Sequence, residues 1–362
     1  MATGFAFSAE DVERASRYHR PLYLALLLDV ALAAAVLAVL AWSGAGDRLF
    51  SAVDSLPPVA AAAAYAALVA TCSSVVRTPL AFWRGWLRER SWGFSTQSAG
   101  GWFVDRGKGL AVSIVLGAGA WAAAVALARA FPGWWPLPAG AALALAVLFL
   151  SFVAPVVLEP LFNRFRPLED EVLAADLRGL SERAGVPVRD VLVADASRRT
   201  TKVNAYVSGL GGTRRVVLFD TLLETADAGA VRVVVAHELG HRRERHVAKL
   251  TLLAMAGAAG AVAVLWAVLG TRVADPQTLP EALLLLMALE LVTLPAGSWL
   301  SRRFERAADR CSLDLTRDPD AFVRAHVELA RRNLSDLDPP RAAYVFLFSH
   351  PTPPERLALA PL

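Results

Sequence analysis

The chain has 362 residues, of which 56% are hydrophobic and 19% are charged. Its apolar residues gather in long blocks, which is typical of a membrane protein and argues against two or three soluble domains. The formal net charge of +4 is modest, and no basic stretch alternates with aromatic residues, so we expect no nucleic-acid partner. Because Cys72 and Cys311 are the only cysteines, the sequence predicts no disulfide framework.

Six apolar blocks are long enough to cross a membrane as helices. About 20 helical residues at 1.5 Å each cross a hydrocarbon core of about 30 Å. A cleaved signal peptide is the alternative for the first block, but that block is too long and its polar leader contains acids. The second block is Ala-rich and could extend well past Val76. The predicted spans are residues 22–42, 58–76, 110–130, 138–158, 250–270 and 280–300.

Arginines are distributed unevenly between the two sides of these spans. The short segments after the first, third and fifth blocks carry one arginine each, and the opposite side receives the Arg-rich segments. By the positive-inside rule we expect both termini and the soluble segments on the cytoplasmic side, and the Ala- and Arg-rich composition suggests a bacterial cell membrane. Asp29 and Glu290 fall inside the first and sixth blocks, which indicates either an aqueous cavity within the bundle or positions nearer an interface.

The chain therefore divides into an N-terminal membrane domain (1–158), a soluble segment (159–249), two further spans (250–300) and a second soluble segment (301–362). In the first soluble segment we expect a helix over 167–184 and a further helical stretch from Asp220. A further helix begins near Asp227, whose side chain is placed to cap it. This helix continues almost directly into the fifth span. Between the helix 167–184 and the helical stretch from Asp220, three β-branched or alternating runs predict a small antiparallel sheet. They are residues 186–193, 202–210 and 214–219.

Residues 237–241 read His-Glu-Leu-Gly-His, the HExxH pattern. On an α-helix His237 and His241 lie one turn apart on the same face, so both imidazoles can bind one metal ion. A zinc ion with an open position lowers the pKa of its bound water to about 7, and Glu238 is placed to accept the proton. The alternative is a solvated helix that carries two histidines at this spacing by chance.

A catalytic zinc needs a third protein ligand. The residue ten positions after the first histidine is Val247, which excludes the subclass with a third histidine there. His246 follows His241 by five positions, about 140° round a helix, so we expect it to face away from the metal. The best candidate is Glu305, just past the sixth span, with Asp309 one turn later as an acceptor for the N–H of a ligating histidine. A solvated charge among arginines is the alternative for Glu305.

With these motifs in place, the chain resembles the type I CAAX prenyl endopeptidases, which are integral-membrane zinc proteases of the gluzincin class and distant relatives of the heat-shock HtpX proteases. The likeness covers most of the chain. It rests on HELGH, on SRRFERAAD at 301–309, on the tail 344–357, on the loop 90–97 with Trp102 and Asp105, on 159–168, and on 204–206 with 217–222.

The resemblance implies a fold, a cofactor and roles for single residues. It implies a gluzincin zinc protease with a large intramembrane chamber. Together with the predicted spans and sidedness, the expected fold is an α-helical integral membrane protein of about six spans that encloses a water-filled chamber and carries a cytoplasmic-face α+β gluzincin domain. One Zn²⁺ would be held by His237, His241 and Glu305, with Glu238 as general base and Asp309 supporting a ligand. Further residues would contact the substrate or its oxyanion, by hydrogen bonds or by β-augmentation. They are Asn204, Ala205, Tyr206, His350 and Arg356.

The function implied is a zinc endopeptidase, similar to CAAX prenyl protease 1, that cuts near the C-terminus of CAAX-type or related peptides in the bilayer, prenylated or not. An HtpX-like quality-control protease for misfolded membrane proteins is the alternative. A catalytically silent membrane scaffold is a further alternative, and the intact set of candidate ligands argues against it. Two departures bear on the substrate: Ser95 stands where the family loop usually has Asn, and six spans are predicted where eukaryotic members are described with seven.

Overall fold

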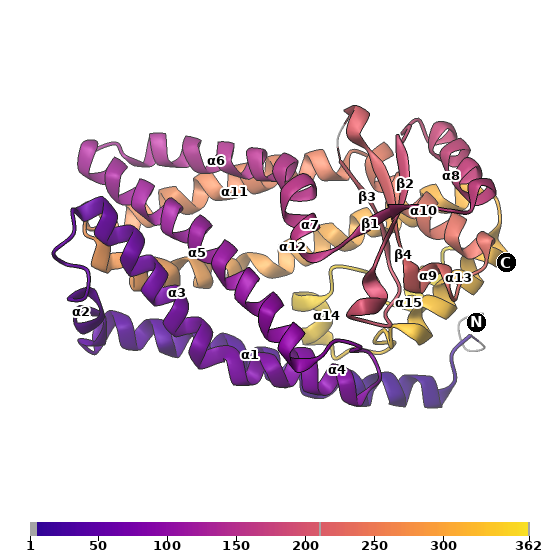
Figure 1. Ribbon diagram of the computed structural model, residues 1–362, viewed down its shortest axis with the longest axis horizontal. Helices are drawn as coiled ribbons and strands as arrows, with labels where there is room; N and C mark the ends of the chain where they lie inside the picture. Colours follow the sequence, from indigo (N-terminus) through magenta and orange to yellow (C-terminus); the bar gives the residue numbers. More distant parts are fainter. Residues whose placement is uncertain (1–5, 210, 361–362) are drawn as a thin grey trace.

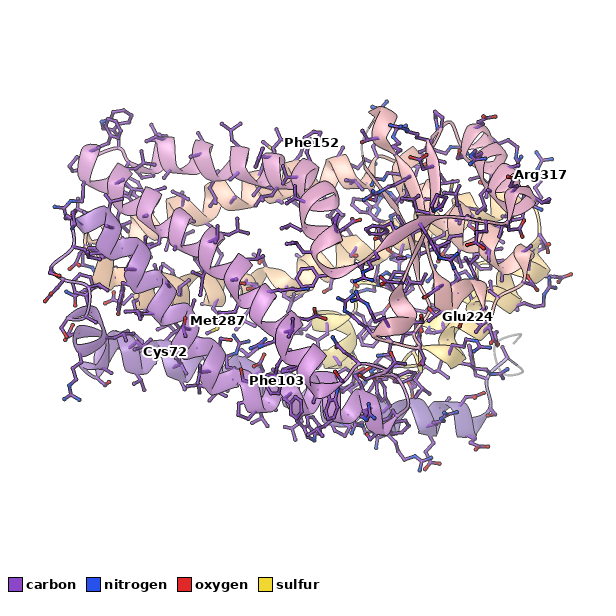
Figure 2. The ribbon with its side chains drawn as sticks, in the orientation of Figure 1. Cys72, Phe103, Phe152, Glu224, Met287 and Arg317 are labelled. Carbon is purple, nitrogen blue, oxygen red and sulfur yellow. The ribbon has the colours of Figure 1, made fainter. Side chains whose placement is uncertain are left out.

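The structure is a computed structural model that describes residues 6–209 and 211–360. It is elongated, with a helical bundle at one end and a smaller mixed helix-and-sheet part at the other (Figure 1). Nitrogen and oxygen atoms gather around the sheet, whereas the helical end carries mostly carbon on its surface (Figure 2). Phe152 on the outer surface of this bundle is 51% exposed, as expected for a side chain that meets lipid.

Six helices within the described residues are long and apolar enough to cross a membrane, which confirms the predicted number of spans. Several of them run beyond the apolar blocks, because polar residues continue the helix towards the sheet. They are α1 (Ala9–Trp42), α3 (Pro58–Phe82), α5 (Ala99–Ala130), α6 (Pro136–Val153), α11 (His246–Leu269) and α12 (Leu279–Thr316).

Short helical elements connect the spans. The second span does continue past Val76: α3 runs through the π-helical turn Trp83–Leu87 into α4 (Arg88–Ser91). A second π-helical turn, Ala154–Leu158, joins α6 to α7 (Glu159–Phe162). The other connections are α2 (Ala45–Phe50) and the 3₁₀ segments Gly270–Ala274 and Pro276–Thr278.

The bundle is closed at the end away from the sheet. There an apolar core includes Val69, Val125 and Trp135, and the Trp135 indole donates to the carbonyl of Gly270 at 3.3 Å. From this end the helices diverge towards the sheet (Figure 1). Only 6% of the apolar window of α12 is buried. Most side chains of α12 in this window therefore face lipid or space inside the bundle rather than a packed core.

The two carboxylates predicted inside spans differ in their surroundings. Asp29 is buried and accepts two hydrogen bonds from Arg77 of α3, at 2.9 and 2.8 Å. Such pairing is what a carboxylate at membrane depth requires. Glu290 is exposed on α12. An aqueous cavity around these residues stays a prediction.

The sheet has the strand order β1-β2-β4-β3 and is mixed. Its strands are β1 (Phe165–Pro167), β2 (Asp190–Ala194), β3 (Ala205–Ser208) and β4 (Arg215–Phe219). The prediction of an antiparallel sheet was wrong, because β2 and β4 pair in parallel. After β2 the chain passes over the position of β4 and forms β3 at the outer edge of the sheet. It then turns back and forms β4 between β3 and β2, so β4 runs antiparallel to β3 and parallel to β2. Strand β1 was missed because it has only three residues and ends in proline.

The predicted strand boundaries also shift. Strand β2 begins at Asp190 rather than at residue 186, and Leu210, at the end of the predicted second strand, lies outside the described residues. Helices cover the sheet and extend the soluble part as α8 (Glu171–Arg183), α9 (Asp220–Leu223), α10 (Ala228–Arg243), α13 (Pro319–Arg332), α14 (Arg341–Leu347) and α15 (Pro353–Leu357).

Helix α10 carries the HExxH motif. A capping residue fixes its N-terminus, and two of its faces pack against other elements. As predicted, Asp227 caps it by accepting a hydrogen bond from the N–H of Ala230 at 2.7 Å. Its apolar face enters the core between the sheet and α8, where Leu239 is fully buried. Its other face packs on α12 at Gly240, where an added Cβ would lie 3.1 Å from the backbone of Ala308. This close approach sets the distance between the HExxH helix and Glu305.

We expect Gly240→Ala to separate α10 from α12. The methyl group meets backbone atoms that cannot move aside, and overpacking of this kind costs about 1–3 kcal/mol. The Tm should fall, and the bound metal should dissociate more readily because its ligands come from both helices. Gly260→Ala on α11 is the matched control, since its Cβ would meet open space. Equal metal content and Tm in both variants would contradict the prediction.

Candidate metal centre

The structure brings His237, His241 and Glu305 together, although Glu305 lies on a different helix. One ligand atom from each lies within 4.8 Å of the others. The Nε2 atoms of the two histidines are 3.2 Å apart. Glu305 Oε2 lies 3.2 Å from Nε2 of His237, and Oε1 lies 3.2 Å from Nε2 of His241. Three donor atoms therefore converge on one point.

These residues fit a metal ion. Oε2 of Glu305 is buried and, among the described residues, has no hydrogen-bond partner in acceptable geometry. A buried carboxylate oxygen without a partner is costly, and two imidazole nitrogens with lone pairs facing each other repel. A cation between the three groups removes both penalties. Two imidazoles and one carboxylate, with a position left open, form the donor set of catalytic zinc sites.

Asp309 is placed behind His237. Its Oδ1 lies 2.8 Å from Nδ1 of His237, and the carboxylate is fully buried. The contact holds the ring with Nε2 directed at the other ligands, as a carboxylate partner of a metal-binding histidine does. His326 lies nearby, with Nε2 at 3.6 Å from the same oxygen.

Arg356 was predicted to contact substrate, and the structure places its guanidinium on Asp309. Its Nε donates to Oδ2 at 2.9 Å, and Nη2 donates to Oδ1. A bidentate pair of this kind compensates the buried charge of the carboxylate. Arg356 also lines the cavity described below, so a role in substrate binding stays a prediction.

As predicted, His246 is not among the three residues that could hold the metal, but it contacts His241, one of those three. Helix α10 ends at Arg243, and Arg245 adopts a left-handed conformation with φ of 55° before α11 begins. The turn brings Nδ1 of His246 to 3.1 Å from Nδ1 of His241. Its ring also stacks on Phe304, 4.2 Å between centroids. The 140° separation held only for an unbroken helix, and no proline or glycine in the sequence marked the break.

Protonation of the metal-free site follows from these contacts. Burial lowers the pKa of His237, but the neighbouring carboxylates of Asp309 and Glu305 prevail and raise it to about 9. Burial raises the pKa of Glu238 above its ordinary value, although the neighbouring His237 and His241 oppose this. A metal ion must therefore displace a proton from His237, and Glu238 is a stronger base than an exposed glutamate.

A cavity of about 760 Å³ opens beside these residues. His237, Glu238, Asn204 and His350 are among the residues that line it. Nε2 of His350 lies 3.4 Å from Oε1 of Glu305, so the tail of the chain brings this imidazole to the ligand set. The Asn204 side chain is exposed, and its Oδ1 accepts the N–H of the next residue at 2.9 Å.

The predicted substrate strand lies at the edge of the sheet. Asn204 accepts the N–H of Phe219 across β3 and β4, so the alternate residues Ala205 and Val207 direct their backbone groups outward. The Ala205 side chain is buried in the core, so only its backbone can meet a peptide. Tyr206 Oη donates to Glu159 at 3.2 Å and is thus directed towards α7.

The loop 90–97 lies against the segment that leads into β3. Thr201 donates its N–H to Phe94 at 3.0 Å, and Thr96 donates to Arg199 at 3.1 Å. Ser95, where the family loop usually has Asn, forms a β-bridge with Thr200. The loop therefore helps to fix the position of the edge strand. This contact between distant segments left no signal in the sequence beyond the family likeness.

We expect His246→Ala to weaken metal binding about 10- to 100-fold, because His241 loses the partner that orients its ring. His246→Asn should restore much of the affinity, since its Oδ1 can accept from Nδ1–H of His241. The measurement is titration with a competing chelator. The prediction fails if Ala and Asn at this position bind metal equally well.

Metal affinity should depend on pH. With a pKa of about 9, His237 of the metal-free protein is mostly protonated at pH 7 to 8. Each metal ion then displaces one proton from it, so the apparent affinity should rise about tenfold per pH unit in this window and level off above pH 9. Calorimetry in two buffers with different ionisation enthalpies counts the protons released. No proton release at pH 7.5 would reject the assignment.

Comparison with known proteins places this site in a family. The profile of peptidase family M48 matches residues 167–360, and the profile described as the CAAX prenyl protease N-terminal region with five membrane helices matches residues 5–164. Four of the six candidate spans lie within the latter range.

Single proteins related to this chain include metalloproteases. An uncharacterized metalloprotease of Bacillus subtilis (strain 168), YhfN, is 33% identical over 224 residues, 58% of this chain and 52% of that protein. CAAX prenyl protease 1 of Saccharomyces cerevisiae is 29% identical over 198 residues, 54% of this chain and 43% of that protein. The matches thus span about half or less of these relatives.

The fold matches the crystal structure of S. mikatae Ste24p with a TM-score of 0.88 at 22% identity, covering 99% of this chain and 90% of that one. The fold class is therefore that of a multi-pass helical membrane protein with a small mixed sheet. With one family profile over more than half of its length and a second over most of the remainder, the chain belongs to peptidase family M48.

Proposed function

We propose that the chain is a membrane-embedded zinc endopeptidase that hydrolyses a peptide bond near the C-terminus of CAAX-type or related substrates. The observation that carries the proposal is the convergence of His237, His241 and Glu305 beside Glu238 at the wall of a cavity. The edge strand that borders this cavity offers backbone groups to an extended peptide. Relatives named CAAX prenyl protease 1 support the substrate class.

His237, His241 and Glu305 would hold the zinc ion. A zinc ion bound there supplies Lewis acidity, which activates a water molecule and polarises a peptide carbonyl. Asp309 keeps His237 in the tautomer that leaves Nε2 free for the metal, and His246 does the same for His241.

Glu238 is the group that moves the proton. Its carboxylate accepts a proton from the attacking water and then delivers it to the leaving amine. Its raised pKa lies closer to neutral pH than that of an exposed glutamate, so Glu238 can both accept and deliver a proton efficiently. Nε2 of His350, which lies 3.4 Å from Glu305, can donate to the oxyanion that develops on the carbonyl, and the Asn204 amide is a second donor at the same wall.

The peptide would add to β3 as a further strand. Ala205 and Val207 direct backbone groups outward, and Arg242 of α10 donates to the Val207 carbonyl at 2.5 Å. Arg242 thus occupies the Val207 carbonyl, and the Asn204 side chain occupies the Ala205 N–H. An added peptide would pair with the Ala205 carbonyl and the Val207 N–H, or displace these side chains. Hydrogen bonds to this edge would fix the register of the scissile bond.

We also propose the domain division and the sidedness. The catalytic part would comprise residues 159–249 and 301–362, on the cytoplasmic face, and the membrane part residues 1–158 and 250–300. The excess of arginine on the segments next to the sheet supports this orientation. The diverging helices and the exposed Glu290 support a water-filled chamber inside the bundle.

The test is cleavage of one CAAX-ended peptide, with and without a farnesyl group, by the purified full chain in detergent. Cleavage that depends on the lipid supports a prenyl-protein processing enzyme. Equal cleavage of both peptides favours quality control of unprenylated substrates. A lack of turnover on both peptides and on casein, by protein that has bound zinc, would reject the proposal.

We expect Glu238→Gln to retain the metal and the fold but to lower kcat by at least about 10³-fold, because the amide cannot accept a proton. Glu305→Gln is the contrasting variant, which should lose most of its zinc because a ligand is removed. Metal content by mass spectrometry and turnover are measured on the same samples. Full activity of the first variant would exclude Glu238 as the base.

A further inference from the structure

The cavity extends from the metal ligands along α1 to the π-helical turn before α4. Its walls in between are mixed. The apolar side chains include Leu22, Leu26, Val203, Leu329 and Phe348, and polar side chains such as Tyr23 and Asn333 lie among them. A volume of about 760 Å³ lies in the range of sites that enclose small ligands and is too small for a folded domain. The cavity therefore suits a few residues of extended peptide with apolar side chains.

Two of the three arginine or lysine side chains that line the described cavity are already paired. Arg356 is held by Asp309. Nζ of Lys202 lies 2.7 Å from Oε2 of Glu89 and donates to Tyr18 Oη at 3.0 Å. Their charges are therefore compensated within the protein.

The third, Arg84, forms a longer ion pair than the other two. Within the described residues the carboxylate near it is Asp29, at 4.0 Å, and Asp29 already accepts two hydrogen bonds from Arg77. The Arg84 side chain is 36% exposed and lines the cavity. The carboxylate of Asp336, also in the wall, is occupied by the hydroxyl of Tyr23 at 2.6 Å. Arg84 thus presents a positive charge to the far end of the cavity.

Local backbone geometry also singles out this position. Arg84 lies within the π-helical turn Trp83–Leu87, which interrupts the otherwise continuous helix from α3 to α4. Such wide turns have poorer hydrogen bonding than an α-helix and occur frequently at functional sites.

The direction of a bound peptide connects the metal centre to Arg84. A peptide antiparallel to β3, the more stable pairing, runs from the Ser208 end towards Ala205. Its C-terminal part then continues past Asn204 towards Lys202, where the cavity leads to Tyr18 and Arg84. Three residues beyond the scissile bond span at most about 10 Å.

We infer that Arg84 binds the C-terminal carboxylate of the substrate, so that the enzyme selects peptides that end a few residues beyond the scissile bond. The inference rests on the proposed peptidase function. A guanidinium fork can hold a carboxylate by two hydrogen bonds, and the apolar side chains of the walls strengthen that contact. An internal loop of a misfolded protein has no such carboxylate, so Arg84 would separate tail processing from general degradation.

The experiment measures binding without turnover. The full chain with Glu238→Gln, loaded with zinc in detergent, is titrated with an N-acetylated, S-farnesylated tetrapeptide of Cys, two aliphatic residues and Met. The peptide is used once as the free acid and once as the C-terminal amide. We expect the acid to bind about 10- to 100-fold more tightly than the amide. Adding Arg84→Gln should remove this difference and leave binding of the amide unchanged.

Arg84→Lys should keep part of the preference, because it retains the charge but not the fork. Arg90→Gln is the matched control, since Arg90 is an exposed arginine on the neighbouring α4 whose guanidinium lies over Trp86, outside the cavity wall. It should keep the full preference for the acid.

Three outcomes would overturn the inference: equal binding of acid and amide, an equal loss of both in Arg84→Gln, or no binding of either peptide. The proposed peptidase function is judged separately, by turnover of the farnesylated acid and of casein by the unsubstituted chain. Turnover without a preference for the free acid would leave the peptidase function standing and reject only the role of Arg84.

Discussion

The close contact between α10 and α12 at Gly240 is the constraint on which the catalytic centre depends. HExxH supplies two of the candidate ligands from a helix packed in the core, and the third candidate comes from the extension of a membrane-crossing helix. Only a residue without a side chain lets the backbones approach closely enough for Glu305 to meet the two imidazoles. Hydrophobic burial of Leu239 on one face of α10 and the contact with Ala308 on the other thus set the ligand geometry.

The buried polar groups around the centre form a compensated network. Asp309 would be an expensive charge in this position, but Arg356 from the C-terminal tail and His237 from α10 share it. The same arrangement makes the tail part of the catalytic centre, because Arg356 and His350 both belong to it. A change in the tail therefore reaches the metal ligands through two short contacts.

The membrane part is built on a different principle. Its helices pack tightly at one end, around Trp135, and diverge towards the sheet. In lipid, apolar side chains gain little from packing against each other, so polar contacts such as Asp29 with Arg77 can decide where helices meet. Because Arg77 donates to both carboxylate oxygens of Asp29, Arg84 stands 4.0 Å from that carboxylate.

Glu305 was selected by its place after the sixth span and by family likeness, and the packing of α12 on α10 brings it to the two histidines. Local sequence patterns determined the six spans and the capped HExxH helix, because helical periodicity and hydrophobic length act over neighbouring residues. They could not determine the mixed order of the sheet, since strand pairing depends on a chain crossing that no residue pattern records. They also missed the contact between His246 and His241, because a single left-handed residue, Arg245, turns the chain back where the sequence has no glycine or proline. The contact of Arg356 with Asp309 and the position of Arg84 at the cavity wall arise only when distant segments pack together, so the tertiary structure alone decided them.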